Sequence, residues 1–279
     1  MAVAAAVTRF REETVAQFEQ TKSQLGMATT KENMMNGLSA VFLVSGANGD
    51  TATTRGQNGL ISYSGRQNAQ VTVTLKEKHA AKSMTGFDVF ASQGNQADGL
   101  KSDVIGIINR DMDLVILAAL AAATQDFGTS TLDLTTVLGA VAILGNNQVP
   151  TDEVDNMFGI LSPAANAYLA QIPEFANAQY VDVKPFAGGI SKKYKRWADV
   201  NWIVSPLVTG LGTASEILYI FHRRSIGYAI SMGAEKVFAD YNTEQGYNWA
   251  RAEVFHEAAV LQNSGIIKIT HDGSGFVAT

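Results

Sequence analysis

The sequence predicts an α+β fold organised around one exceptionally long helix. Residues 98–125 carry apolar side chains at three- and four-residue spacing and contain no proline, which is the pattern of a single helix. Short runs such as VTVTLK at 71–76 and EILYIF at 216–221 indicate strands before and after it. Between the first strands lies a polar stretch, 46–70, that has few residues able to enter a core.

The composition limits the classes of function. The chain has 279 residues, enough for one large domain or two modest ones. Only 17% of the residues are charged while 46% are hydrophobic, a balance typical of a chain whose surface is covered by partner subunits. A net charge of −5 argues against a protein that grips nucleic acid through its phosphates. Because the chain has no cysteine, disulfides, thiol catalysis and thiolate metal sites are excluded.

The first part of the chain predicts an amphipathic helix over 7–25. Its apolar face consists of Val7, Phe10, Val15, Phe18 and Leu25. The pattern fits two interpretations equally: an arm that packs on another surface, or an ordinary first helix of the core. We expect no secretory signal, because the N-terminus lacks a basic leader followed by a long apolar run.

A long polar segment follows, which predicts either a two-stranded protrusion or a disordered loop. The run AVFLVS at 40–45 predicts a strand, and VTVTLK at 71–76 predicts its partner. The stretch between them is rich in Gly, Asn, Thr and Ser, and its apolar exceptions are Leu60, Ile61 and Tyr63. Since an isolated hairpin is marginally stable in water, we expect an extended one to need a neighbouring surface.

The long helix is expected to begin with Asp98 or Ser102 as its cap and to close at Gly128. It is apolar on every face from Leu114 to Ala123, so we expect this half to be buried all round. The apolar run is about half of what a membrane span requires, and charged residues interrupt it on one side. We call the predicted helix, 98–125, the spine helix.

The remaining elements can be assigned in order. Residues 82–91, with MTGFDVFA, predict a strand, and 133–144 predict a helix capped by Asp133. Ser162 and Pro163 begin a second helix after a buried strand at 157–161. The other predicted strands lie within 180–206, around Gly188 and Gly189, and at 216–221, 226–232, 237–241, 250–260 and 266–270.

Few residues suggest a catalytic or metal-binding site. The sequence contains no nucleophile elbow, P-loop or dinucleotide fingerprint, and its four histidines form no metal-binding set. Glu253 and His256 lie in a predicted strand on opposite faces, so we interpret them as a surface or rim pair. Asp111 and Asp113 do not face each other on a helix, and we interpret them as surface charges or links to a neighbouring strand.

Two other segments can each be interpreted either as a ligand-binding site or as a contact between protein surfaces. The glycine-rich stretch 46–65 could hold a phosphate through its amides, but no helix opens behind it, so a protruding contact loop explains it better. One basic cluster interleaved with aromatic residues could bind nucleic acid, although the acidic chain favours a subunit contact. This cluster consists of Lys192, Lys193, Tyr194, Lys195, Arg196 and Trp197.

The order of these elements resembles that of the major capsid proteins of tailed bacteriophages, which have the HK97-type capsid fold. An amphipathic arm precedes a long polar hairpin, one exceptional helix, a mixed region with ILSPAANAYL and a final strand pair, RAEVFHEAAVLQNSGIIKIT. The segment SIGYAISMGAEKVF is similar to the passage between that family's domains. The resemblance implies an N-terminal arm at 1–45, an extended β-hairpin loop at 46–78, a peripheral domain at 79–128 and 232–279, and a mixed α/β axial domain at 129–231.

The implied function is structural. A protein of this family self-assembles into hexamers and pentamers of an icosahedral shell that encloses double-stranded DNA, in a virion assembled in the host cytoplasm. We expect contacts with copies of itself, with portal, scaffolding and decoration proteins, and only loosely with DNA. We expect no membrane contact, cofactor, metal or catalytic residue. The side chains expected to touch neighbouring subunits at the loop tip are Arg55, Gln57, Asn58, Tyr63 and Arg66.

Three alternatives remain open from the sequence. The nearest is an encapsulin-like compartment, which shares the fold but stores an enzyme. Another virion structural protein, such as a tail component, is the second. The third, an α/β enzyme, requires a pocket where several polar groups with perturbed pKa values converge.

Overall fold

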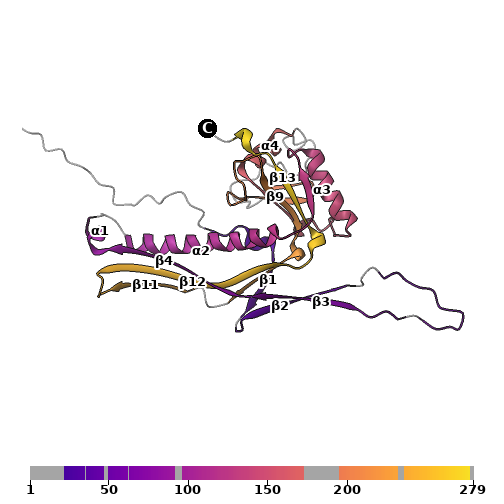
Figure 1. Ribbon diagram of the computed structural model, residues 1–279, viewed down its shortest axis with the longest axis horizontal. Coiled ribbons are helices and arrows are strands. Elements are labelled where there is room, and N and C mark those ends of the chain that lie inside the picture. The colour runs from indigo at the N-terminus through magenta and orange to yellow at the C-terminus, as the bar shows by residue number, and fades with distance from the viewer. Residues whose placement is uncertain are drawn as a thin grey trace, which may run out of the picture.

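The computed structural model describes residues 22–34, 36–46, 50–61, 63–91, 96–172, 195–231 and 236–276. Within these ranges the chain forms a five-stranded sheet, a six-stranded sheet and a two-stranded hairpin (Figure 1). The helix α2 (Gln96–Ala121) lies along the five-stranded sheet, and its C-terminal end reaches the body that contains the six-stranded sheet. The predicted α+β fold with one dominant helix is confirmed. The amphipathic segment predicted upstream of Lys22 lies outside the described residues.

The five-stranded sheet is centred on one long strand, β12 (Tyr247–Val260). One edge of β12 pairs antiparallel with β10 (Ile226–Ser231) and β11 (Lys236–Asn242), and the other edge pairs antiparallel with β4 (Lys76–Thr85). The strand β1 (Thr30–Met34) extends the sheet by parallel pairing with β10. A short 3-10 helix, η1 (Leu25–Ala28), leads into β1.

The helix α2 covers one face of this sheet because both elements present an apolar stripe. Val104 and Ile116 are fully buried on α2, while Ala250 and Val254 are fully buried on β12. Side chains alternate between the faces of a strand, so alternate residues of β12 meet the helix. At 1.5 Å per residue the 26-residue helix is about 39 Å long.

The six-stranded sheet forms the second body. Its order is β5 (Asp126–Thr129), β13 (Ile266–His271), β9 (Glu216–His222), β6 (Met157–Leu161), β8 (Val200–Val204) and β7 (Lys195–Trp197). The helices α3 (Leu134–Asn146) and α4 (Pro163–Gln171) belong to this body (Figure 1). Its short 3-10 turns are η2 (Val154–Asn156), η3 (Arg223–Ser225), η4 (Asn263–Gly265) and η5 (Ser274–Phe276).

Helix starts follow the predicted caps in this body. The Asp133 side chain accepts a hydrogen bond from the Thr136 amide at the start of α3, at 2.7 Å. Ser162 does the same for the Ala165 amide at the start of α4, at 2.9 Å, with proline at the next position. Each side chain satisfies an amide that has no partner within its helix.

The hairpin consists of β2 (Ser39–Gly46) and β3 (Gln67–Thr74), paired antiparallel over their whole length. Its base packs on the five-stranded sheet, and the connection between the strands projects away from both bodies (Figure 1). The predicted extended hairpin is confirmed, with the first strand at the predicted position and the second beginning four residues earlier than VTVTLK.

One predicted strand is wrong. Residues 82–91 divide into the end of β4 and a short helix, α1 (Gly86–Ala91). Thr85 Oγ1 accepts from the Asp88 amide at 3.2 Å and donates to the Asp88 carboxylate at 2.6 Å. This reciprocal cap favours the helix over continued strand pairing.

The ends and environment of the spine helix also differ from the prediction. It begins at Gln96, so Ser102 lies inside it and hydrogen-bonds the Gly99 carbonyl. It ends at Ala121, and Gly128 belongs to β5 instead of closing the helix. Its second half is not buried all round, because Leu114 is 44% exposed and Ala118 is also exposed. The other sides of this half are buried, and a stripe with Leu114 and Ala118 stays exposed.

Sheet membership bears on the domain boundaries expected from the sequence. Those boundaries assign β10 to the axial part and β13 to the peripheral part. In the structure β10 pairs with β12 in the five-stranded sheet, and β13 pairs with β9 in the six-stranded sheet. Among the described residues, no helix is long and apolar enough to cross a membrane.

Burial on α2 supports a first prediction. Replacing Ile116, which is fully buried, by alanine leaves a cavity and should lower the free energy of unfolding by about 2–5 kcal/mol. Leu114→Ala on the exposed stripe is the matched control and should cost less than about 1 kcal/mol. Urea unfolding followed by circular dichroism measures both. Equal losses of unfolding free energy in the two variants would contradict the description of Ile116 as buried and Leu114 as exposed.

Candidate assembly surfaces

The loop between β2 and β3 is exposed throughout its described part. A tight turn forms at its centre, where the Gly56 amide donates to the Leu60 carbonyl and the Gly59 amide donates to the Gly56 carbonyl, at 3.0 and 2.8 Å. Gly59 has a φ of +71°, a conformation that favours glycine. The turn therefore gives the loop tip a local shape although its residues are exposed in the described part of the subunit.

The structure places the five predicted contact residues along this loop, all of them exposed. Arg55, Gln57 and Asn58 surround the central turn, and Tyr63 is 90% exposed. Arg66 lies at the base of the loop, where its guanidinium donates to Ser45 Oγ at 2.5 Å. The residues therefore share one projection without forming a pocket, and whether they touch a neighbouring subunit stays a prediction.

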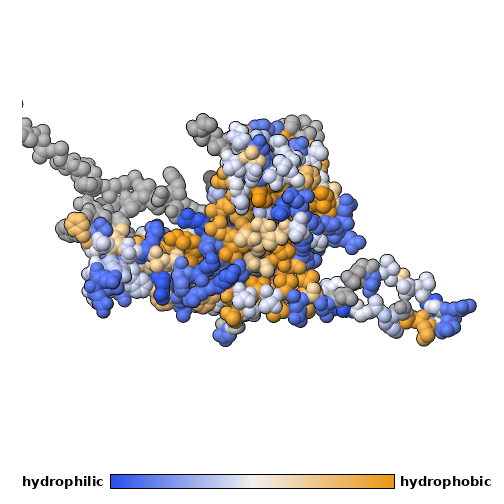
Figure 2. All heavy atoms as spheres, in the orientation of Figure 1, coloured by the Kyte–Doolittle hydropathy of each residue, from blue (hydrophilic) through white to orange (hydrophobic). Residues whose placement is uncertain are grey.

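Apolar side chains accompany the polar ones on this projection. Leu60 is 74% exposed and Ile61 is 51% exposed, next to Tyr63. Figure 2 shows hydrophobic and hydrophilic side chains side by side near the far end of the loop. Among the described residues these large apolar groups have no surface to pack on, which is typical of a contact surface.

The hairpin base has one covered and one open face. Ala40, Phe42, Val73 and Leu75 are buried against the five-stranded sheet, where they meet Ala229. On the opposite face Val41 is 56% exposed and Leu43 is 62% exposed. In the part of the chain that the structure describes, β2 and β3 pair only with each other. The base therefore offers an apolar face and unpaired strand edges to other molecules.

A buried carboxylate on α2 anchors the segment that leads to the N-terminus. Asp113 is fully buried and accepts from Ser23 Oγ at 2.7 Å, from the Gln24 amide at 3.0 Å and from the Leu25 amide at 3.1 Å. Hydrogen bonds to an ionised acceptor are about twice as strong as neutral ones. Asp113 therefore holds residues 23–25 against α2, a contact that we call the arm anchor, and its interpretation as a surface charge missed this role.

Its neighbour Asp111 joins α2 to the strands β12 and β4. The carboxylate lies 3.1 Å from His256 Nε2 on β12 and 3.5 Å from Lys78 Nζ on β4. This confirms the predicted link to a neighbouring strand. The interpretation of His256 as a surface or rim residue is wrong, because the side chain is fully buried between α2 and β12.

Three buried histidines have pKa values below the ordinary 6.5, and in each case the main cause is burial, which disfavours the charged ring. The Asp111 carboxylate opposes the shift in the pKa of His256. His222 Nδ1 accepts from the Arg224 amide, and His271 Nδ1 accepts from the Leu132 amide, at 3.2 and 3.1 Å. Because their ring nitrogens accept hydrogen bonds, His222 and His271 are interpreted as neutral histidines of the core.

The basic cluster is described only in part. Lys192, Lys193 and Tyr194 lie outside the described residues. Arg196 forms an ion pair with Asp155 and donates to Asn201 Oδ1 at 3.1 Å. The Trp197 side chain is 7% exposed, so it belongs to the core and cannot stack on bases.

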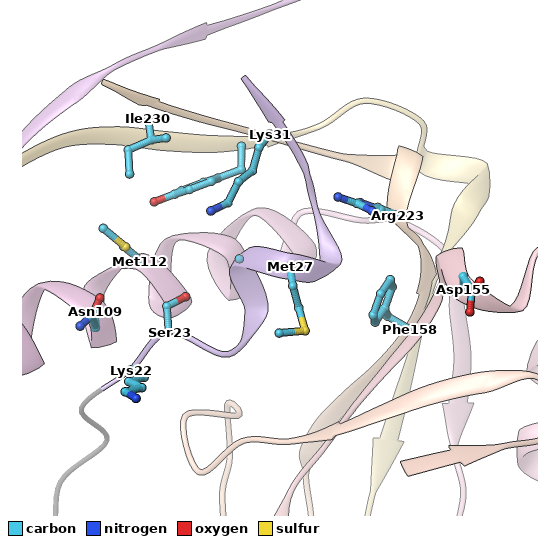
Figure 3. A pocket seen from close by; sticks show the side chains of 12 residues that line it. Lys22, Ser23, Met27, Lys31, Asn109, Met112, Asp155, Phe158, Arg223 and Ile230 are labelled. Carbon is cyan, nitrogen blue, oxygen red and sulfur yellow. The ribbon is translucent and has the colours of Figure 1, made fainter. Parts of the chain in front are cut away.

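A hollow of about 620 Å³ lies beside the arm anchor (Figure 3). Side chains from α2, η1, β1 and β10 line it, among them Met112, Met27, Lys31 and Ile230. Its lining mixes methionines with surface cations and does not resemble a catalytic centre. No group of three potential metal ligands occurs among the described residues.

Comparisons with known proteins agree on one class. A family model described as phage capsid protein matches residues 2–273. The capsid of Ralstonia phage GP4 is similar in structure with a TM-score of 0.74 at 9% identity, covering 99% of this chain and 98% of that chain. A structure from Mycobacterium phage Che8 gives 0.71 at 12% identity, covering 95% and 97%. The capsid of Cyanophage P-SCSP1u gives 0.70 at 12% identity, covering 96% and 93%. No curated protein matches the sequence.

The anchor supports a second prediction. Asp113→Asn keeps the size of the side chain but turns an amide group toward backbone donors, so it should cost about 2 kcal/mol or more in unfolding free energy. It should also speed hydrogen exchange at the Gln24 and Leu25 amides. Asp103→Asn, which removes only an exposed pair with Lys82, should cost less than about 1 kcal/mol. Unchanged exchange at the two amides would contradict the anchoring role.

The buried histidines support a third prediction. The unfolded chain takes up protons as pH falls below the ordinary histidine pKa of 6.5, while the folded chain resists them. The free energy of unfolding should therefore be greatest above pH 6.5 and fall below it. His256→Gln should reduce that slope by up to about 1.4 kcal/mol per pH unit. Urea unfolding across this pH range measures the slope, and an identical slope in the variant would refute the assignment.

Proposed function

The chain belongs to the phage capsid protein family, and we propose that it builds its shell from hexamers and pentamers of itself around double-stranded DNA. It is a major capsid protein, a structural component of the virion shell. The family match does not favour the encapsulin-like alternative. The observation that best supports the proposed mode of assembly is the projecting loop, whose side chains Leu60, Ile61 and Tyr63 are exposed in the described part of the subunit.

We assign the two bodies to the two expected domains. The five-stranded sheet with α2 is the proposed peripheral domain, and the six-stranded sheet with α3 and α4 is the proposed axial domain. The pairing of β10 and β13 supports moving the boundaries so that β10 joins the peripheral domain and β13 joins the axial domain. Under this assignment the axial bodies meet around the symmetry axes of capsomers.

The loop is the proposed contact between neighbouring subunits. Arg55, Gln57 and Asn58 would make polar contacts around the central turn, and Tyr63 would cover apolar surface beside Leu60. Arg66 would act at the base, where its bond to Ser45 already restricts it. A contact of this kind combines an apolar centre with a polar rim, as protein interfaces commonly do.

Other partners follow from the family and from charge. A closed shell that packages DNA requires a portal, and scaffolding or decoration proteins would act on its inner or outer surface. The net charge of −5 supports only loose, non-specific attraction to the packaged DNA. Assembly would take place in the host cytoplasm.

Charge reversal in the loop tests the proposal. The double variant Arg55→Glu and Arg66→Glu should lower the yield of closed particles at least about tenfold, because like charges at a contact cost more than one kcal/mol. The free energy of unfolding should stay within about 0.5 kcal/mol of the parent, since both residues are exposed.

Particle yield is measured by sedimentation and electron microscopy. Arg55→Lys with Arg66→Lys keeps both charges and is the matched control, which should retain most of the yield. Normal yield from the glutamate variant would remove these two residues from the interface.

A further inference from the structure

The strand β11 forms an open edge of the five-stranded sheet. Among the described residues it pairs only with β12, and that pairing runs without a register shift from Lys236 to Asn242. An edge strand presents a row of N–H and C=O groups on its outer side, which a further strand can pair with. Figure 1 shows β11 at the end of the sheet away from the projecting loop, so its edge is a separate surface.

The other outer edges of the two sheets carry features that hinder such pairing. The strand β4 contains three lysines, Lys76, Lys78 and Lys82. The strands β1 and β7 are five and three residues long and carry charged side chains, and the four-residue β5 has a register shift in its pairing. Short, charged or irregular edges disfavour the addition of a strand. The seven-residue β11 is longer than β1, β5 and β7, and its single lysine is its first residue.

Both faces of β11 carry exposed apolar side chains. Val237 lies opposite Ala252 on the face that α2 covers and is still 43% exposed. Phe238 points to the other face, where its ring lies 5.5 Å from the Arg251 guanidinium, and is 39% exposed. Exposed apolar groups on both sides of an open edge fit a partner that continues the sheet.

The charges of β11 are complementary to those of a second β11. Two copies that pair antiparallel are related by a two-fold axis perpendicular to the sheet, and opposite residues point to the same face, so even-numbered residues meet even-numbered residues. With Phe238 opposite the partner's Phe238, Lys236 lies opposite the partner's Asp240, and Val237 lies opposite the partner's Ala239. Centring the pair on Ala239 instead puts Phe238 opposite Asp240, and centring it on Asp240 opposes two carboxylates.

The helices leave room for this pairing. Three strand spacings, together about 14 Å, would separate the two β12 strands. Two helices of about 10–12 Å diameter fit side by side at that distance. The ion pairs of Asp103 with Lys82 and of Asp111 with Lys78 also hold α2 on the β4 side of β12, away from the β11 edge.

We propose that β11 pairs antiparallel with β11 of a second copy, centred on Phe238, so that two five-stranded sheets become one continuous sheet across a two-fold axis. Lys236 and Asp240 then form two equivalent ion pairs, and the two Phe238 rings meet on the face away from α2. The pairing is a contact between copies within the proposed shell and therefore rests on the proposed self-assembly, but it does not involve the projecting loop.

A single cysteine tests the register, because the chain has no native cysteine. Opposite residues of an antiparallel pair have Cα atoms about 4.5–5.5 Å apart, which a disulfide can span. The full-length variant Phe238→Cys should therefore form a covalent dimer on a non-reducing gel after mild oxidation. The matched control is Ser83→Cys, which is exposed on the same face of β4, at the opposite edge, and should stay monomeric.

Particle yield, measured by electron microscopy of the same samples, tests the proposed shell separately. Closed particles without Phe238→Cys dimers would overturn the pairing and leave self-assembly standing. Dimers without closed particles would support the pairing and contradict the shell. Equal dimer formation in Phe238→Cys and Ser83→Cys, or no dimers in either, would overturn the pairing whatever the particle yield.

A charge exchange provides the second test. In the Phe238→Cys background, Lys236→Asp or Asp240→Lys alone puts like charges opposite each other and should lower the dimer yield about tenfold. An equimolar mixture of these two variants should restore the yield, because each aspartate then faces a lysine of the other copy. Since Lys236 also lies opposite Glu253 on β12, the mixture is compared with each variant alone, which keeps that effect constant. A mixture that dimerises no better than its components would overturn the proposed register.

Discussion

The packing of α2 against β12 is the interaction on which the rest of the subunit depends. β12 presents the small, buried residues Ala250 and Ala252 to the helix, so the helix can lie close to the sheet. The same strand binds β4 on one edge and β10 and β11 on the other, and thereby joins segments from four parts of the chain. Loss of this contact would separate the hairpin, the arm anchor and the long helix at once.

Alternation along the strands explains where the hairpin attaches. His256 on β12 faces α2, so Phe255 faces the opposite side, where it packs against the hairpin base with Ala229. The five-stranded sheet is therefore covered on one face by the helix and, near its middle, on the other by the hairpin. The loop beyond this base projects away from both bodies of the described subunit (Figure 1), and we propose that other copies complete it.

Much of this fold could be predicted from the sequence because local patterns determine it. The periodicity of α2, the caps Asp133 and Ser162, and the polar run between two strands each involve residues close in the chain. The helix α1 was missed although its signal, threonine followed three residues later by aspartate at Thr85 and Asp88, was local. The run MTGFDVFA alternates enough to resemble a strand, and this alternation hides the capping signal.

The buried polar contacts whose partners the sequence does not identify join residues far apart in the chain. Asp113 contacts Ser23, which is 90 positions away, and Asp111 contacts His256, which is 145 positions away. Glu216 is fully buried and accepts from Ser162 and from the Gly212 amide. A single sequence does not reveal such pairings, since a charged residue on a helix has the same local pattern whether it faces water or an amide.

We propose that neighbouring subunits complete the projecting loop in a closed shell. Electron cryomicroscopy of particles assembled from the full-length protein tests it most directly. We expect closed shells in which residues 50–66 lie against an adjacent subunit, with Leu60 and Tyr63 covered. Closed shells in which this loop stands free in solvent, or a protein that remains monomeric under assembly conditions, would contradict it.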